Sequence, residues 1–261
     1  MKINLAAVLI PIYKKTPNDL EILSLRQCLS VLKNHKIIFF APKDLEYSFY
    51  KQVCQEFDCV FDIMFFDNSY FNGIIGYNKL MLSSHFYKSF LKYKFILIYQ
   101  LDAFVFKDDL EFWCNQKYDF IGAPNHAHLN NQGEMQFLKN FSRVMRFFRV
   151  KKEISNVGNG GFSLRNTRSC YLLVKILSAV VKKWHPNNED GFFKYYGNIF
   201  FPFFKLPSDE EAIKFSIEVE AKSTLAKLNG NVPFGCHAFE KYEWETWKPL
   251  VENTINFNKW I

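Results

Sequence analysis

The first 66 residues alternate between short apolar runs and segments with helical spacing. The runs 4–10, 36–42 and 59–66 are dominated by apolar residues, as strands buried on both faces of a parallel sheet are. Two helices are predicted between them, one over 18–33 and one from Asp44 to about Phe57. This order requires right-handed crossovers, so the chain is predicted to form a doubly wound, mostly parallel α/β sheet flanked by helices.

The remaining chain continues with further predicted elements and contains no internal repeat and no low-complexity linker. One continuous domain over 1–261 is therefore favoured over two independent ones. The further predicted elements are a helix over 77–90, a strand interrupted by one acid over 94–106, a strand over 117–124, an amphipathic segment over 137–150, a glycine-rich turn and strand over 158–166, a helix over 167–183, a loop over 185–193 that leads into a short helix, a helix near 208–215, and extended aromatic-rich segments around 233–242.

Composition restricts the classes of protein. Of the 261 residues, 49% are hydrophobic, which excludes a disordered chain and allows a substantial core. The formal net charge of +7 favours phosphate-bearing ligands or anionic surfaces. The sequence shows no nucleic-acid-binding motif and no long basic tail, so we expect no nucleic-acid partner.

The six cysteines form no CxxC pair and show no metal-type spacing. The apolar N-terminal run is short, contains Pro11 and lacks a cleavage site, so it is predicted to be a first strand rather than a signal peptide. No run of about 18 apolar residues occurs, and no transmembrane helix is expected. We therefore expect a cytoplasmic protein whose cysteines are free thiols.

An acid directly follows a buried strand in the segment QLDAF (100–104). The strand delivers Asp102 to its carboxyl end, which is the edge at which open α/β sheets bind ligands. A charged residue there costs free energy unless it has a partner, and a Mg²⁺ or Mn²⁺ ion that holds a diphosphate is one such partner. In the alternative, structural interpretation Asp102 caps a turn or pairs with a basic side chain.

Three later segments contain residues suited to a site. In GNGGFSLR (158–165) the glycines let the backbone approach a ligand closely, although a tight turn would also need them. The pattern is neither a P-loop nor a dinucleotide fingerprint. In NEDGFF (188–193) two adjacent acids stand at a predicted helix N-terminus, where stabilisation by the helix dipole is the alternative to an acid–base role. In PFGCHAF (233–239), His237 is either a site residue or a hydrogen-bonded core residue.

In their order along the chain, these segments resemble a family of bacterial and fungal GT-A-type glycosyltransferases, many of which are described only as a domain of unknown function. The resemblance rests on YQLDAFVF, YDFIGAP, GNGGFSLR, NEDGFF and PFGCHAF, and extends from about residue 5 to 245. It implies a GT-A fold, a nucleoside-diphosphate sugar donor and transfer of the sugar to an acceptor hydroxyl. We expect residues 1–120 to form the nucleotide-binding half and 121–261 the acceptor-binding half.

The resemblance implies roles for single residues. Asp102 falls where such enzymes carry an acidic DxD-type motif that meets a metal-bound diphosphate. Only one carboxylate of that motif remains here, so either a loosely held metal or a cationic side chain would hold the diphosphate. His237 matches a histidine that contacts the metal or the diphosphate. Asp190, with Glu189 second, is expected to be the general base on the acceptor hydroxyl of an inverting reaction. Lys79 is expected to contact the donor phosphates.

Further donor contacts are implied at the first strand and at the glycine-rich turn. Pro11, Ile12 and Tyr13 follow the first strand, where similar enzymes hold the nucleotide base and ribose, and Tyr13 could stack on a uracil-like ring. Gly160 and Gly161 are expected to line the pocket for the donor sugar and the acceptor. The expected donor is a UDP-sugar, and the expected cofactor is Mn²⁺ or Mg²⁺.

A basic amphipathic helix is predicted at 137–152, with apolar residues on one face and Lys139 and Arg143 elsewhere. Such a helix either rests on an anionic membrane surface or packs on the protein with a solvated basic face. His126 and His128 would face the same side of an extended segment, but no further metal ligand is near them.

The sequence therefore predicts a bacterial, cytoplasmic glycosyltransferase that acts on a cell-surface glycan such as lipopolysaccharide or capsule, with peripheral contact with the inner membrane if the basic helix serves that purpose. The alternative is a non-catalytic nucleotide-sugar- or glycan-binding protein of the same fold, which the missing second acid would favour. A nucleotidyltransferase fits less well, because the segment 10–19 after the first strand has no glycine.

Overall fold

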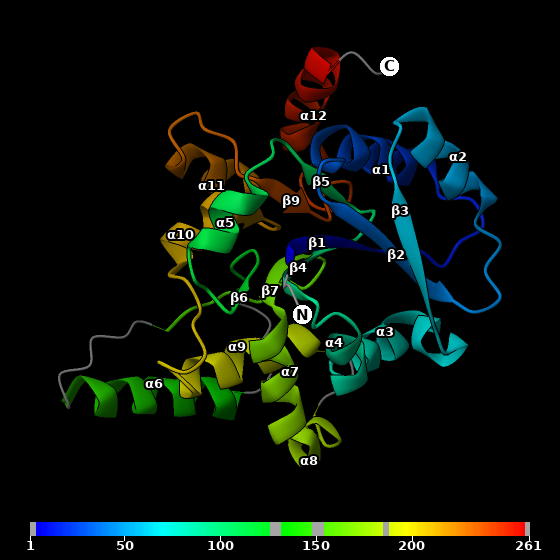
Figure 1. Cartoon of the computed structure of the whole chain (residues 1–261). Coiled ribbons are helices and arrows are strands. Elements are labelled where there is room, and N and C mark those ends of the chain that lie inside the picture. Colours follow the sequence, from blue (N-terminus) through cyan, green and yellow to red (C-terminus); the bar gives the residue numbers. More distant parts are fainter. Residues whose placement is uncertain (1–3, 126–131, 148–153, 185–187, 259–261) are drawn as a thin grey trace.

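The computed structural model describes residues 4–125, 132–147, 154–184 and 188–258 (Figure 1). Its central sheet has six strands: β1 (Asn4–Pro11), β2 (Lys36–Pro42), β3 (Phe61–Phe66), β4 (Tyr93–Tyr99), β6 (Phe120–Ile121) and β7 (Phe162–Asn166). They lie in the order β3-β2-β1-β4-β7-β6. The first four are parallel, and β7 runs antiparallel to both of its neighbours. The predicted mostly parallel α/β sheet is confirmed.

A second, small sheet stands beside the first and brings distant parts of the chain together. Its strands are β5 (Ala103–Val105), β8 (Ser216–Ile217) and β9 (Gly235–His237), in the order β5-β9-β8. In the antiparallel β5–β9 pair, Ala103 lies opposite His237. This ladder joins the end of the QLDAF segment to the PFGCHAF segment.

Helices cover both faces of the central sheet (Figure 1). They are α1 (Asp19–Leu32), α2 (Ser48–Glu56), the 3₁₀ helix η1 (Asn68–Phe71), α3 (Gly73–Met81), α4 (Ser84–Ser89), α5 (Leu110–Asn115), α6 (Gln132–Phe147), α7 (Thr167–Ile176), α8 (Ser178–Val181), α9 (Glu189–Ile199), α10 (Asp209–Phe215), α11 (Ala221–Lys227) and α12 (Trp244–Asn258).

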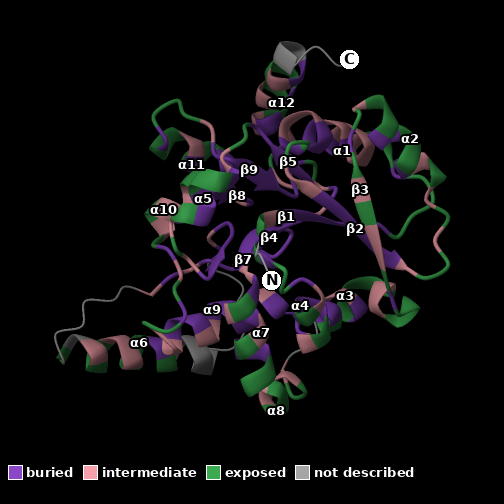
Figure 2. Ribbon diagram, in the orientation of Figure 1, coloured by how far each residue is buried: buried purple, intermediate pink, exposed green. Residues whose placement is uncertain are grey.

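The core is divided by the sheet. In β1, Val8 and Ile10 pack on one side with α1, α2 and α5, whereas Ala7 and Leu9 pack on the other with α3, α4, α7 and α9. This two-residue alternation, with both faces buried, explains why the strand is apolar throughout. Figure 2 shows the buried residues concentrated along the strands.

Several predicted boundaries were wrong. Helix α2 begins at Ser48 and not at Asp44, because the carboxylate of Asp44 accepts a hydrogen bond from Asn68 Nδ2 and residues 42–45 form a turn. The predicted helix over 77–90 is two helices, α3 and α4, and Ser83 caps the second by accepting from the backbone N–H of His85. The predicted helix over 167–183 likewise divides into α7 and α8.

The extended segment predicted around 233–242 contains β9, but helix α12, which follows it, was not predicted. Pro249 lies inside this helix, where its ring removes a backbone hydrogen bond, so the sequence gives a poor helix signal. Trp247, Val251 and Ile255 are spaced by four residues and are all buried, and their burial stabilises the helix despite the proline.

Helix α6 confirms the helical prediction within 137–147, while 148–152 lies outside the described residues. So do His126 and His128. All six cysteines are free and buried. Among the described helices, none is long and apolar enough to cross a bilayer.

Candidate functional site

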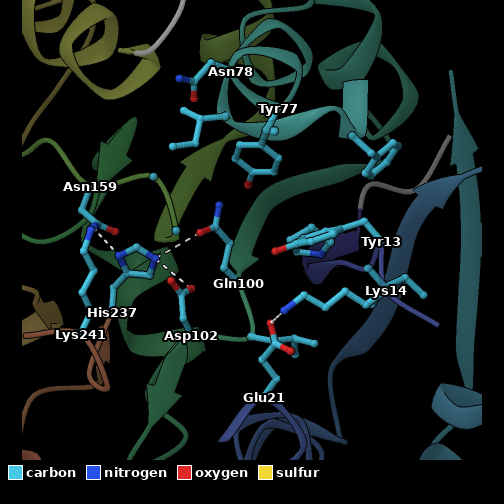
Figure 3. Close-up of a pocket in the computed structure, with 18 of the residues that line it drawn as sticks. Tyr13, Lys14, Glu21, Tyr77, Asn78, Gln100, Asp102, Asn159, His237 and Lys241 are labelled. Atoms are coloured by element: carbon cyan, nitrogen blue, oxygen red, sulfur yellow. Dashed lines mark hydrogen bonds and ion pairs between the residues drawn. The ribbon is translucent and has the colours of Figure 1, made fainter. Parts of the chain in front are cut away.

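A cleft with a volume of about 630 Å³ opens at the carboxyl ends of β1 and β4 (Figure 3). Its walls come from the residues after β1, the β4–β5 turn, the start of α3, the 159–161 turn, the start of α9 and the end of β9. Segments from the whole length of the chain therefore meet at the sheet edge where open α/β folds bind their ligands.

Asp102 and His237 face each other in this cleft. Asp102 precedes β5 and His237 ends β9, so the backbone ladder between these strands sets their positions. Asp102 Oδ1 lies 3.1 Å from His237 Nε2, and 37% of the Asp102 side chain stays exposed. The acid is thus paired but still accessible from the cleft.

Three more polar side chains surround the imidazole of His237. Gln100 Oε1 lies 3.2 Å from Nε2, while Asn159 Nδ2 and Glu218 Oε1 lie 2.8 Å and 3.3 Å from Nδ1. Burial alone disfavours the charged imidazole, but the carboxylates of Asp102 and Glu218 outweigh it and raise the pKa of His237 to about 10. The imidazole is therefore a cation at neutral pH in the absence of a ligand.

A buried ion pair lies beside the 159–161 turn. Arg165, on β7, is fully buried and its Nη2 donates to Glu189 Oε1 at 2.9 Å. The same guanidinium donates to Tyr87 Oη at 2.8 Å, Ser163 Oγ at 3.0 Å and the Gly160 carbonyl at 3.2 Å. Arg165 therefore holds both the Glu189 side chain and the 159–161 turn in place.

Asp190 stands next to this pair and differs from Glu189 in its environment. Burial, and next the negative charge of Glu189, raise the pKa of Asp190 well above its usual range. Within the described residues, neither Glu189 Oε2 nor Asp190 Oδ1 meets an N–H or O–H donor, so a proton held between the two carboxyls would satisfy both. Capping of α9 falls to Asn188, whose Oδ1 accepts from the Gly191 N–H at 2.7 Å.

Gly160 and Gly161 connect the two halves of the site. A Cβ atom on Gly160 would overlap carboxylate oxygens of both Glu189 and Asp190, and a Cβ on Gly161 would overlap the imidazole of His237. Only a residue without a side chain allows the backbone to pass so close to both groups.

The far end of the cleft is formed by residues that follow β1. Figure 3 shows Tyr13 and Lys14 on the side opposite His237, with Gln100 and Asp102 between them. Lys14 Nζ pairs with Glu21 Oε1 at 2.6 Å. Tyr13 is 54% exposed, so its ring is available to a ligand.

The cleft brings together nine of the ten residues predicted from the sequence: Pro11, Ile12, Tyr13, Asp102, Gly160, Gly161, Glu189, Asp190 and His237. Lys79 is not among its lining residues: it is exposed on α3, and its neighbours Tyr77 and Asn78 line the cleft instead. A phosphate contact by Lys79 stays a prediction.

Sequence reasoning missed Gln100, Asn159, Arg165 and Glu218. The first three lie within or directly beside the QLDAF and GNGGFSLR segments, so those motifs could have indicated them. Glu218 stands in no motif, and only the pairing of β8 with β9 shows that it lies beside His237.

A family model described as "Protein of unknown function (DUF5672)" matches residues 60–237, which is more than half of the chain. The chain belongs to this family. The DUF5672 match includes the QLDAF, GNGGFSLR and NEDGFF segments and ends at His237. No curated protein sequence matches the chain.

Solved structures of glycosyltransferases share the fold of this DUF5672 protein. The apo structure of the bifunctional glycosyltransferase WbbM matches 98% of this chain and 50% of its own, with a TM-score of 0.55 and 12% identity. The apo glycosyltransferase GlyE from Streptococcus pneumoniae TIGR4 matches 97% of this chain and 64% of its own, with a TM-score of 0.51 and 11% identity. This chain thus spans about half to two thirds of their lengths. At such identities the likeness shows the fold alone, which is the GT-A-like fold predicted from the sequence.

Proposed function

We propose that this DUF5672 protein is a glycosyltransferase that moves a sugar from a nucleoside-diphosphate sugar to an acceptor hydroxyl. One observation carries the proposal: the Asp102–His237 pair and the Glu189–Asp190 pair converge in a single cleft, on either side of the Gly160–Gly161 turn. The first pair suits a diphosphate leaving group, and the second suits proton removal from an acceptor.

The charge of the cleft indicates how a diphosphate would be accommodated. Among the described residues, six acids line it against two lysines: Glu21, Asp102, Glu189, Asp190, Glu218 and Glu240 against Lys14 and Lys241. Such a lining repels a diphosphate unless a cation accompanies it. A divalent metal ion is one such cation, and the charged imidazole of His237 is another.

The side chains around Asp102 fit a metal ion that is shared with the donor. Asp102 Oδ1 and Gln100 Oε1 lie 3.1 Å and 3.2 Å from His237 Nε2. Carboxylate, amide oxygen and imidazole are donors that could hold Mg²⁺ or Mn²⁺, provided that the ion displaces the proton from His237 Nε2. No cluster of three or more His, Cys, Asp or Glu side chains in the described residues could hold a metal by itself. Phosphate oxygens of the donor would therefore complete the coordination, and the ion would stabilise the charge that develops on the leaving diphosphate.

Asp190 is the proposed general base. Glu189 is fixed by Arg165, which leaves Asp190 as the carboxylate free to take a proton from the acceptor hydroxyl. Its pKa is raised, so the carboxylate is a stronger base than an exposed aspartate once the proton shared with Glu189 has left. Attack opposite the leaving diphosphate would invert the configuration at the sugar.

We propose that Ile12 and Tyr13 hold the base and ribose of a UDP-sugar at the far end of the cleft, because they follow β1 and line that end. On this proposal the part of the chain up to about residue 120 binds the nucleotide, and the remainder positions the acceptor. The acceptor is a cell-surface glycan such as lipopolysaccharide or capsule, glycosylated in the cytoplasm.

The experiment is a binding and turnover screen of purified protein with nucleotide sugars, with and without Mn²⁺. A bound donor raises the apparent stability, and the increase should be larger with Mn²⁺ in the wild type. Asp102→Asn should remove the effect of Mn²⁺, whereas the matched control Asp62→Asn, on the surface of β3, should retain it.

Two results would contradict the proposal in different ways. Donor binding without any hydrolysis or transfer would support the non-catalytic binding protein of the same fold. Absence of binding for every nucleotide sugar, with the fold intact, would remove the assignment altogether.

A further inference from the structure

The positive charge of the chain is unevenly distributed along the sequence. Two stretches, 68–101 and 154–188, contain nine of the 33 Lys and Arg residues and none of the 26 Asp and Glu residues. The rest of the chain contains 24 basic and 26 acidic residues, so the net charge of +7 originates in these two stretches.

Folding brings the two stretches together on one side of the molecule. Helix α4 of the first stretch packs against α7 of the second, and α8 continues from α7 at the lower side of Figure 1. Six basic side chains of these helices and the residues just after them are exposed: Lys88, Lys92, Arg168, Lys175, Lys182 and Lys183. We call this set the basic face. Within the described residues none of the six forms an ion pair with a carboxylate.

Exposed aliphatic residues stand among these cations. Ile176 is 72% exposed, Leu172 42% and Leu91 38%. Leu172 and Ile176 are one turn apart on α7, and Lys175 and Lys92 are the sequence neighbours of Ile176 and Leu91. Figure 2 shows exposed residues along α7 and α8.

We propose that the basic face docks the protein on an anionic phospholipid bilayer. A cluster of lysines without acids is attracted by the negative surface of such a bilayer, and interleaved aliphatic side chains gain by entering the interface. A nucleic acid or a polysaccharide would match the charge but would leave Ile176 and Leu172 in water. The combination of both residue types therefore selects a bilayer.

The basic face also has a suitable position relative to the cleft. Helix α3 lines the cleft through Gly73, Ile74 and Tyr77, and it packs against α9, which carries Glu189 and Asp190. Helices α3, α4, α6, α7 and α8 all lie at the lower side of Figure 1. Docking through this side would hold the cleft close to the membrane, where, if the proposed function holds, a lipid-linked glycan would be presented to Asp190.

The test is co-sedimentation of the full chain with vesicles, which needs no donor and no turnover. Vesicles of phosphatidylcholine with about a third phosphatidylglycerol should bind the protein, pure phosphatidylcholine should not, and salt well above about 0.1 M should release it. The triple variant Lys175→Gln, Lys182→Gln, Lys183→Gln should weaken binding about a hundredfold, since each cation contributes a factor of about five.

Two matched controls separate the basic face from total charge and from general hydrophobicity. The triple variant Lys15→Gln, Lys43→Gln, Lys51→Gln removes the same charge from exposed lysines elsewhere and should bind vesicles nearly as well as the wild type. Ile176→Ser should weaken binding several-fold, whereas Val60→Ser, at a residue that is 80% exposed, should not.

The outcomes decide between partners. No binding to anionic vesicles, or equal losses in both triple variants, would overturn the proposal. If the protein bound a single-stranded RNA as well as vesicles, and Ile176→Ser had no effect, the partner of the basic face would be a polyanion and not a bilayer. The result for vesicles is independent of glycosyltransferase activity, so failure of one proposal can be told from failure of the other.

Discussion

Replacement of Arg165 by Met tests how the two carboxylates of the cleft are held. The variant removes the ion pair with Glu189 and the hydrogen bonds to Tyr87, Ser163 and Gly160, while a side chain of similar length keeps filling the space between strand and helix. Glu189 is only 2% exposed, so its carboxylate would be left without a cation in a buried site.

The size of the stability loss depends on whether Glu189 stays charged or takes up a proton. Breaking a buried pair typically costs about 3–5 kcal/mol. A carboxyl can escape this cost by taking up a proton. For a glutamate with an ordinary unfolded-state pKa of about 4.3, protonation costs about 3.7 kcal/mol at pH 7 and about 1 kcal/mol at pH 5. A buried neutral carboxyl binds more protons folded than unfolded, so the penalty must shrink as the pH falls.

Urea unfolding of the wild type and of Arg165→Met at pH 7 and at pH 5 measures these differences. We expect a loss of about 3–5 kcal/mol at pH 7 that becomes smaller by about 2–3 kcal/mol at pH 5. In Arg165→Met/Glu189→Gln the part of this pH dependence that comes from Glu189 should disappear, because Asp190 is then the only carboxyl left in the pair. A loss that is the same at both pH values, or below about 1 kcal/mol at pH 7, would refute the buried-pair argument.

Three further predictions concern single side chains. Asp190→Asn should lower kcat by about 10²–10⁴ and leave the donor Kd nearly unchanged in steady-state and binding assays; a large loss of donor affinity would contradict its role as the base. Gly161→Ala should displace His237, because the new Cβ would overlap the imidazole, and the Mn²⁺-dependent thermal shift with nucleotide sugar should vanish. Asn18→Ala removes the capping box that Asn18 forms with Glu21 at the start of α1, and urea unfolding should show a loss of about 1 kcal/mol.

The fold was largely predictable because the strands that build its centre carry the strongest signals. β1, β2 and β4 are apolar on both faces since helices cover both faces, and such runs are recognisable without any tertiary information. The start of α2 was not predictable in the same way. Asp44 is a good helix-capping residue locally, but its carboxylate accepts a hydrogen bond from Asn68, 24 positions later, and it lies in a turn.

The candidate site was predictable where its residues stand in motifs at the ends of elements. Asp102 and Gly161 belong to such segments. Glu218 does not: it reaches His237 because β8 pairs with β9, and a two-residue strand leaves no pattern in a sequence. The difference between Glu189 and Asp190 was equally inaccessible, because it arises from a guanidinium that points to one carboxylate and not to its neighbour.

The β5–β9 ladder has a consequence for how such proteins can diverge. Asp102 and His237 come from strands far apart along the chain, and the connection between them runs through most of the C-terminal half and contains several loops. A slip of one residue within β9 is different, because alternate side chains of a strand point to opposite faces and Cys236 would then turn toward Asp102. Members with this site should therefore vary freely in the length of the connection while keeping the spacing inside both short strands unchanged.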